Sequence, residues 1–346
     1  MKTLAVSTAI RTLYHTGAHR LFSPHYAGVG SILMFHRISS RPGGSFAPNY
    51  GLGVTAKFFE AVIQRILNRG IDIVDLAEVR RRLSEKDFRK KFICLTFDDG
   101  YLDNFEEAFP VCRRLGTPMT IYVTTGFIDR TARCWWLGLD HAVSKSKNLL
   151  VRWHGRELRL RCGTTTEKQV AFATCSDLFN AANPQEREAL CAEMERASGV
   201  DFLAETDMNF MTWDQVRELA ESGLVTIAGH TTTHSQLARM SRHTVESEIA
   251  GGCVTLESRI GKPVTHFAYP FGRESDAGER EFAICRSLGL LTAVTTRPGT
   301  LMPEHAATPY ALPRLGVSGW HQNLATIDVM LSGATAALSN GFRRVV

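Results

Sequence analysis

Short apolar runs alternate with amphipathic stretches along most of this 346-residue chain. Apolar runs of about four to eight residues predict buried β-strands, and stretches with apolar residues every three or four positions predict helices that cover them. This alternation is typical of a parallel sheet with helices outside, so the pattern predicts an α/β fold. Strands are expected over about 31–35, 71–74, 92–97, 119–123, 224–228, 265–269, 291–296 and 310–317, and helices over about 55–70, 75–84, 104–115, 244–260, 278–288 and 321–332.

The alternation is interrupted in the middle of the chain. An aromatic-rich stretch begins at Trp135 and Trp136, and a hairpin that turns at Gly155 and two helical patterns follow it. The strand–helix rhythm resumes after a capping box at 212–215. We therefore expect residues 135–210 to form a subdomain inserted into the main fold, at the end where such insertions shape a binding site.

Composition narrows the class of protein. Hydrophobic residues make up 44% of the chain and charged residues 22%, as in ordinary soluble globular proteins. A net charge of +5 is too small for this length to favour nucleic-acid binding. No run approaches the roughly 18 apolar residues of a membrane span. The eight cysteines are scattered without a C-x-x-C pair, which predicts reduced, buried residues rather than disulfides.

The N-terminal region is basic. No acidic residue precedes Glu60, and charged or polar side chains interrupt any signal-peptide core, so a cytoplasmic enzyme is expected. Residues 4–22 predict an amphipathic helix. This helix either packs on the body of the protein or associates weakly with an anionic membrane surface. Its apolar residues are Leu4, Ile10, Leu13, Tyr14, Leu21 and Phe22.

The strongest candidate for chemistry is the sequence Asp98-Asp99-Gly100, which follows a buried strand. Successive strand side chains point to opposite faces, so the two carboxylates share a pocket only if the chain turns, as Gly100 allows. The C-terminal ends of parallel strands are where α/β folds place their active sites. The alternative is a turn without chemistry, since Asp and Gly are ordinary turn residues.

A second candidate is the pair His230 and His234, which follows another apolar strand. Two imidazoles four residues apart meet on one side of a helical turn, as metal-ligating pairs do. In zinc proteases a glutamate after the first histidine is the base, whereas here Thr231 occupies that position. A base must come from elsewhere, and Asp98-Asp99 offers one carboxylate to bind a metal and one to take a proton.

Three motifs in this order resemble those of the polysaccharide deacetylases, the carbohydrate esterases that carry a NodB homology domain. They are Thr96-Phe-Asp-Asp-Gly100, His230-Thr-Thr-Thr-His234 and Phe267-Ala-Tyr-Pro-Phe-Gly272. The resemblance covers roughly residues 30–317. It implies a distorted, incomplete (β/α) barrel with an inserted subdomain, which agrees with the number of strands in the pattern.

This resemblance divides the chain into four parts. Residues 1–28 form a basic amphipathic helix, and residues 321–346 form a C-terminal helix and tail. The deacetylase barrel is discontinuous, with the subdomain of residues 135–210 at its mouth. It comprises residues 29–134 and 211–320.

The resemblance also implies roles for the candidate residues. Asp99, His230 and His234 correspond to the ligands of a divalent metal, usually zinc (Zn²⁺), with open positions left for water. Such an ion can lower the pKa of bound water from 15.7 to about 7. Asp98 corresponds to the catalytic base that deprotonates this water, and the nearby cation favours its ionised form.

Two features of the family have no direct counterpart in this sequence. The third motif commonly begins with an arginine that tethers the base, but Ala268 stands there. Arg314 or Arg273 can supply the guanidinium, and we prefer Arg314 because it ends a strand. The usual late Leu-x-His motif, which carries the general acid, is also missing. Leu33-Met-Phe-His36 resembles the first strand of the permuted poly-N-acetylglucosamine deacetylases, so His36 is the candidate general acid.

Four further residues are candidates for contact with the substrate. By resemblance, the backbone N–H of Phe271 binds the oxyanion in the turn that begins at Tyr269. Trp135 and Trp136 either stack on sugar rings or pack into the core of the insertion. The implied partner is an N-acetylated glycan.

The sequence therefore predicts metal-dependent N-deacetylation of an amino sugar in an oligosaccharide, polysaccharide or lipid-linked glycan, with release of acetate. An amidohydrolase acting on a small non-sugar amide is the nearest alternative. A carbohydrate-binding protein with a relic site is another, but a binding module does not need a base beside a metal. A non-haem iron oxygenase uses the same ligand types, yet its β-sandwich does not match the strand–helix rhythm.

Overall fold

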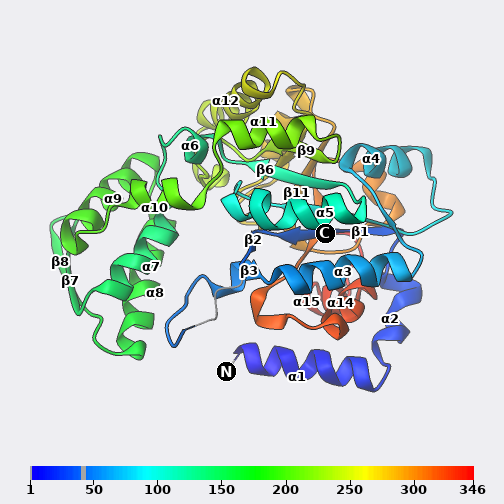
Figure 1. Ribbon diagram of the computed structural model, residues 1–346, viewed down its shortest axis with the longest axis horizontal. Helices are drawn as coiled ribbons and strands as arrows, with labels where there is room; N and C mark the ends of the chain where they lie inside the picture. Colours follow the sequence, from blue (N-terminus) through cyan, green and yellow to red (C-terminus); the bar gives the residue numbers. More distant parts are fainter. Residues whose placement is uncertain (1, 40–43) are drawn as a thin grey trace.

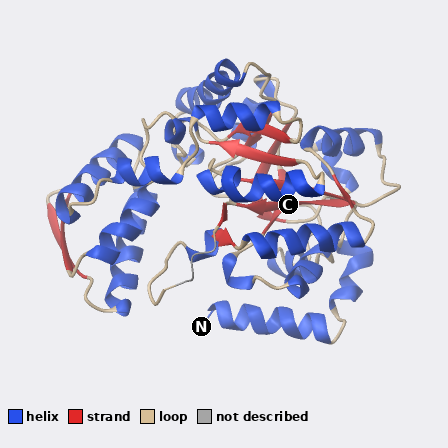
Figure 2. Cartoon of the chain, viewed as in Figure 1, coloured by secondary structure: helices blue, strands red, loops and turns tan. Residues whose placement is uncertain are grey.

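A computed structural model describes residues 2–39 and 44–346 of the chain, and its centre is a closed barrel of seven parallel strands (Figures 1 and 2). The first strand pairs with both β12 and β5, which closes the ring. A further short strand, β4 (Asp72–Ile73), pairs in parallel with the first two residues of β5, Phe92 and Ile93. In order around the barrel, the strands are β1 (Gly30–Phe35), β12 (Leu312–Gly316), β11 (Thr292–Pro298), β10 (His266–Ala268), β9 (Val225–Gly229), β6 (Met119–Val123) and β5 (Phe92–Phe97). The (β/α) barrel expected from the sequence is confirmed: its ring is closed, and it is incomplete in having seven strands where the full (β/α) barrel has eight.

Alternate residues of each strand fill the inside of the barrel. Because parallel strands in a barrel are buried on both faces, inward and outward residues are apolar alike, and β5 is buried at every position. The inward residues form their own apolar cluster with side chains of α4 (Leu76–Glu85), which closes one end. Members of the cluster from the strands are Ile32, Phe92, Cys94, Tyr122, Ala228, Ala268, Val294 and Leu312.

Helices surround the barrel close to the predicted positions. Their N-termini carry the expected caps: the Thr55 side chain accepts from the Phe58 N–H, and Thr212 and Gln215 form a capping box. The covering helices are α3 (Ala56–Asn68), α5 (Phe109–Leu115), α11 (Trp213–Glu221), α12 (Arg242–Ile260), α13 (Glu279–Ser287), α14 (Leu324–Leu331) and α15 (Ala334–Ser339). Shorter elements are β2 (Arg37–Ile38), β3 (Gly53–Val54), α6 (Thr125–Ile128) and the single turns η1 (Tyr50–Leu52), η2 (Asn104–Ala108), η3 (Leu237–Arg239), η4 (Pro303–Ala307) and η5 (Gly319–His321).

The interrupted stretch of the sequence forms a lobe beside the barrel, drawn in green in Figure 1. The hairpin turns at Gly155 as the sequence predicts. Buried side chains of the lobe, such as Phe179 and Phe202, belong to the same apolar cluster as the outward face of the barrel. The lobe is therefore packed onto the barrel. It consists of α7 (Trp135–Lys145), β7 (Asn148–Trp153), β8 (Arg156–Arg161), α8 (Thr165–Ala181), α9 (Pro184–Ser198) and α10 (Phe202–Asn209).

The N-terminal region differs from the single helix expected. It forms two helices, α1 (Lys2–His15) and α2 (His19–Tyr26), because Gly17 adopts a positive φ of 73° between them. Ile10 of α1 is buried against Val329 of α14, so this part of α1 packs on the body of the protein. Leu21 is 79% exposed and does not join that contact. No helix within the described ranges is long and apolar enough to cross a membrane.

Candidate active site

Four of the polar candidates lie at one end of the barrel because each falls on the inward-facing positions of its strand, or two residues beyond the last of them. Asp98 follows Thr96 of β5, and His230 follows Ala228 of β9, with the two-residue spacing that keeps side chains on one face. By the same spacing, Arg314 in β12 lies on the inward face. His36 follows β1 in the register of Ile32, which is part of the interior cluster. The inward alternation thus carries four polar side chains to the mouth formed by the carboxyl ends of the strands.

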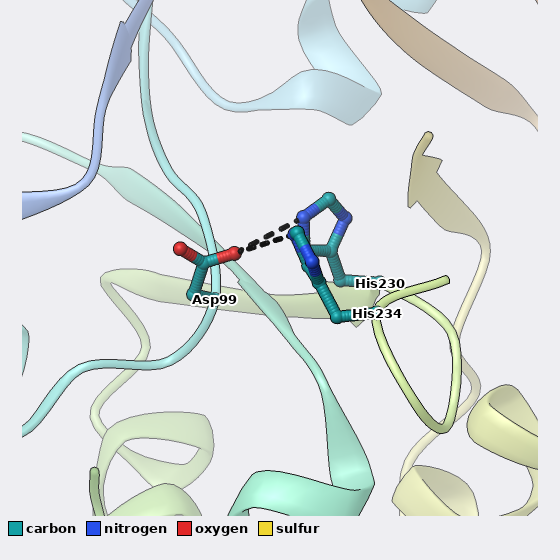
Figure 3. A group of neighbouring side chains, drawn as sticks. All are labelled: Asp99, His230 and His234. Atoms are coloured by element: carbon teal, nitrogen blue, oxygen red, sulfur yellow. Dashed lines mark ion pairs between the residues drawn. The ribbon is translucent and has the colours of Figure 1, made fainter. Parts of the chain in front are cut away.

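Asp99 reaches the same mouth through a sharp turn. Its φ is 78° and that of Gly100 is 88°, both in the left-handed region that ends the strand. Its carboxylate oxygen Oδ1 lies 3.3 Å from Nε2 of His230 and 3.2 Å from Nε2 of His234, as Figure 3 shows. Asp99, His230 and His234 are all buried, and their potential ligand atoms lie within 4.8 Å of one another.

The two histidines do not meet through a helical turn, as the four-residue spacing suggested. The segment after β9 is irregular, and Thr231 and His234 have positive φ values of 65° and 54°. The hydroxyl of Thr231 accepts a hydrogen bond from the His234 N–H at 3.0 Å, which closes this loop. The imidazoles therefore converge because a strained loop folds back on itself.

The three side chains have the chemistry of a metal site. His230 Nδ1 donates to the Ala268 carbonyl at 2.7 Å, so in the neutral ring Nε2 carries a lone pair and faces Asp99. Two buried acceptors 3.3 Å apart repel each other unless a cation lies between them. Ligands at 2.0–2.1 Å from a tetrahedral zinc ion are about 3.3 Å apart. Among the described residues, Asp99 Oδ1 has no hydrogen-bond partner, which fits an oxygen reserved for an ion.

Asp98 has a different environment. Arg314 is fully buried and donates from its two terminal nitrogens to both oxygens of Asp98, at 2.6 and 2.7 Å. Burial favours the neutral acid, but the Arg314 charge outweighs it and holds the pKa of Asp98 below its usual value. Asp98 is therefore ionised at neutral pH. Arg273, the other candidate, is exposed.

His36 is half-buried and directly follows Phe35, whose backbone carbonyl accepts from the Asp98 N–H at 3.0 Å, so His36 and Asp98 lie side by side at the ends of β1 and β5. The backbone carbonyl of His36 accepts from the Asn104 side chain at 2.8 Å. His321 and His305 are engaged elsewhere: His321 contacts Ser7, and His305 accepts from the Met302 N–H. Of these three histidines, His36 is the one placed against the aspartates.

The third motif brings one of its two candidate residues to the site. Phe271 has a positive φ of 60°, and its ring lies 5.0 Å from that of His234. Tyr269 is fully buried, and its hydroxyl donates to the Tyr310 carbonyl at 2.9 Å on the outer side of the barrel wall. The Tyr269 side chain therefore supports the motif from outside and does not line the site.

The two tryptophans of the insertion also differ. Trp136 contacts His234, with ring centroids 5.0 Å apart, and its Nε1 donates to the Tyr101 hydroxyl at 2.8 Å. Trp135 is 6% exposed and stacks on Phe179 at 4.7 Å. These contacts favour packing in the lobe for Trp135 and place Trp136 in the wall of the site.

Sequence reasoning missed two residues that support the site. Tyr101, immediately after Asp-Asp-Gly, is fully buried against Trp136 and Phe210. Glu248 of α12 accepts from the backbone N–H groups of Thr232 and Thr233 at 3.1 and 2.9 Å. The position of Tyr101 beside the motif was a usable signal, whereas Glu248 gave none because it lies in an ordinary helical pattern.

The site combines a carboxylate–histidine cluster with an ionised aspartate at the mouth of a parallel barrel. This combination is typical of hydrolases built on a barrel. The family model for polysaccharide deacetylases matches residues 85–290. This match covers more than half of the chain, and the chain therefore belongs to the polysaccharide deacetylase family. It is a hydrolase of carbon–nitrogen bonds other than peptide bonds.

The chain is also similar to a curated protein and to several solved structures. YxkH of Bacillus subtilis (strain 168), assigned to the polysaccharide deacetylases, is 23% identical over 83% of this chain and 71% of its own length. The deacetylase PplD of Streptococcus pyogenes, solved in complex with acetate, has a TM-score of 0.56 at 19% identity, over 87% of this chain and 96% of PplD. IcaB of Ammonifex degensii has a TM-score of 0.53 at 18% identity, over 86% of this chain and 95% of IcaB. These structures share the fold.

Proposed function

We propose that this protein removes the acetyl group from an N-acetylated amino sugar in an oligo- or polysaccharide, with a divalent metal ion, Zn²⁺, at Asp99, His230 and His234. The observation that carries the proposal is the division of labour between adjacent aspartates. Asp98 is bound by Arg314, and Asp99 Oδ1 faces two imidazole nitrogens. This arrangement leaves one carboxylate for an ion and the other for a proton.

The metal, when bound, supplies a Lewis acid that polarises the acetyl carbonyl and acidifies a water molecule. Asp98 takes a proton from the attacking water, and the buried guanidinium of Arg314 holds its two oxygens in place. The pairing also keeps the base ionised, since it lowers the pKa of Asp98.

The remaining roles fall to groups around the cluster. The Phe271 N–H lies in a turn with positive φ and is proposed to donate to the oxyanion of the tetrahedral intermediate. His36 is proposed to donate a proton to the sugar nitrogen as the carbon–nitrogen bond breaks. Trp136, which is buried beside His234, excludes water from the acetyl side.

Acetate release from N-acetylglucosamine oligomers by zinc-loaded protein tests the proposal. Wild-type protein should release acetate, Asp98→Asn should keep the metal and lose most turnover, and His36→Ala should lose turnover without losing metal. Conversion of small non-sugar amides, with no acetate from any oligomer, would instead establish the alternative amidohydrolase. Full activity of Asp98→Asn would remove Asp98 from the role of base.

A further inference from the structure

A buried arginine of the inserted lobe reaches the loop that carries both histidines. Arg187 lies in α9 and is 6% exposed, although arginine is almost never buried to this degree unless it is paired. Its Nη1 donates to the Ser235 hydroxyl at 3.2 Å and to the His234 carbonyl at 3.4 Å. A charged group of the lobe therefore contacts the backbone of a proposed metal ligand.

Arg187 has no direct counter-ion to balance its charge. Both hydrogen bonds of its Nη1 go to neutral oxygens, and its Nε has no partner among the described residues. Glu188, the next residue, is paired with Arg133 instead. Burial lowers the pKa of Arg187, and Glu248 of α12 is among the groups whose charge opposes this shift. Because a buried cation is costly unless an anion balances it, the connection to Glu248 is important.

Two hydroxyl groups connect Arg187 to Glu248. The Thr233 hydroxyl donates to Glu248 Oε1 at 2.8 Å, and the hydroxyls of Thr233 and Ser235 lie 2.8 Å apart. A hydroxyl has a single hydrogen to donate, and Thr233 uses its hydrogen on Glu248. Ser235 therefore donates to Thr233 and accepts from Arg187. All the hydrogen bonds of this connection run in one direction, from the cation to the anion.

The connection encloses His234, because Thr233 and Ser235 are its two neighbours in the sequence. His234 has a positive φ of 54°, a conformation that persists only where the surroundings hold it. Charged groups at the two ends polarise the hydroxyls between them and strengthen each hydrogen bond. The lobe, through Arg187, and the barrel helix α12, through Glu248, therefore hold the proposed ligand together.

The lobe holds the same segment at two further points. The ring of Trp136 in α7 lies 5.0 Å from that of His234. Arg239, five residues after His234, donates to the carbonyl of Asn180 in α8 at 2.7 Å. Contacts from α7, α8 and α9 thus converge on residues 234–239.

We propose that Arg187 is a positioning residue for the metal site, which fixes His234 through a clamp that ends at Glu248. The clamp consists of these two charged residues and the hydroxyls of Ser235 and Thr233. The inserted lobe, which supplies Arg187, thereby determines how tightly the metal is held. This inference rests on the proposed function, because His234 is a proposed ligand.

Zinc affinity of the full chain, measured by competition with a zinc-binding dye, tests the clamp. Arg187→Met removes its charge and its donors, so the Kd for zinc should rise about 10- to 100-fold. Ser235→Ala keeps both charges but interrupts the clamp, and should raise the Kd about tenfold. Arg187→Lys can still donate to Ser235 and should recover part of the loss. Arg196→Met is the matched control, since it changes an exposed arginine of the same helix that pairs with Glu193.

A purely structural role for Arg187 gives a different result. Arg187→Met would then lower the melting temperature of the metal-free protein and leave the Kd of the folded protein for zinc unchanged, which would overturn the inference. The double variant Arg187→Met with Glu248→Gln is a second test. Because both changes act on one clamp, the Kd should rise by less than the product of the two single effects. A rise equal to that product would show that the two residues act independently, and the clamp would be rejected.

Hydrogen exchange on metal-free protein separates this inference from the proposed function. Backbone amides of residues 230–239 should exchange faster in Arg187→Met and Ser235→Ala than in wild type or Arg196→Met. Zinc binding by wild type, with equal affinity and equal exchange in the variants, overturns the clamp and leaves the metal site. Absence of zinc binding by wild type, with faster exchange in the variants, overturns the metal site and supports the clamp.

Discussion

Arg314 and Asp98 form a fully enclosed bidentate ion pair, with N–O distances of 2.6 and 2.7 Å. The arginine also donates to the Thr295 carbonyl at 2.8 Å, so its orientation is fixed at both ends. Asp99, the next residue, has no such cation and turns its Oδ1 toward the imidazoles instead. Two chemically identical neighbours thus acquire different properties because one faces a guanidinium and the other faces two imidazole nitrogens.

The first prediction concerns this pair. Arg314→Lys keeps the charge but cannot make two parallel hydrogen bonds to a carboxylate. We expect kcat for acetate release to fall at least about tenfold, since the base loses its orientation, while the bound metal stays at wild-type level. Steady-state kinetics and metal analysis on the same preparation measure both. Arg273→Lys, at an exposed arginine, serves as the control, and equal losses in the two variants would contradict a specific role for Arg314.

The second prediction concerns the metal. Asp99→Asn and His234→Ala should each lose stoichiometric zinc, because each removes one of the three proposed ligands. Zinc should raise the melting temperature of wild-type protein and leave that of these variants almost unchanged, since only a ligand bound to the folded state stabilises it. Thermal melts with chelator and with added zinc measure this effect without using activity. A variant whose melting temperature still rises with zinc would show that the ion binds elsewhere.

The sequence predicted the fold well because barrel strands are buried on both faces. Each strand was visible as a continuous apolar run, and the inward register of β5 then placed Asp98 at the mouth. The helical turn proposed for His230 and His234 was wrong, since positive φ values at Thr231 and His234 depend on the surrounding loop rather than on spacing. Local patterns therefore locate the site but not the path of its loops.

Tertiary partners were harder to predict. Arg314 lies 216 residues after Asp98, and only the closure of β12 and β5 around β1 brings them together. Trp135 was chosen for its residue type and Tyr269 for its place in the third motif, yet both side chains are buried in apolar packing. An aromatic residue in a motif or an insertion does not reveal which of its faces will be covered.

The third prediction concerns the loop that carries both histidines. Glu248 receives three hydrogen bonds from it: two from the N–H groups of Thr232 and Thr233, and one from the Thr233 hydroxyl at 2.8 Å. Glu248→Gln replaces a charged acceptor by a neutral one, so the loop should be held less firmly. We expect zinc affinity to fall about 10- to 100-fold, as for other changes beside metal ligands. Competition with a zinc-binding dye measures the affinity, and Glu246→Gln is the control, since it changes a half-buried glutamate of the same helix that pairs with Arg242 instead of the loop. Equal zinc affinity in both variants would show that the loop does not depend on Glu248.

The fourth prediction concerns stability at acid pH. His266 of β10 is 3% exposed and contacts the Thr292 hydroxyl, and burial lowers its pKa to about 4 from the usual 6.5. The unfolded chain therefore binds a proton at this residue between pH 6.5 and 4 when the folded chain does not. The stabilisation is complete above pH 6.5 and is lost as the pH falls toward 4.

Denaturant unfolding at pH 7 and pH 5 measures this contribution. Over that interval His266 should account for a loss of about 2 kcal/mol in the free energy of unfolding, because one pKa unit corresponds to about 1.4 kcal/mol. His266→Gln is less stable at pH 7 if the packing suffers, but its stability should fall by about 2 kcal/mol less than that of wild type between the two pH values. His243→Gln, at an exposed histidine, should retain the wild-type difference. The same pH dependence in both variants would mean that His266 is protonated in the folded state, which its burial among apolar strand residues opposes.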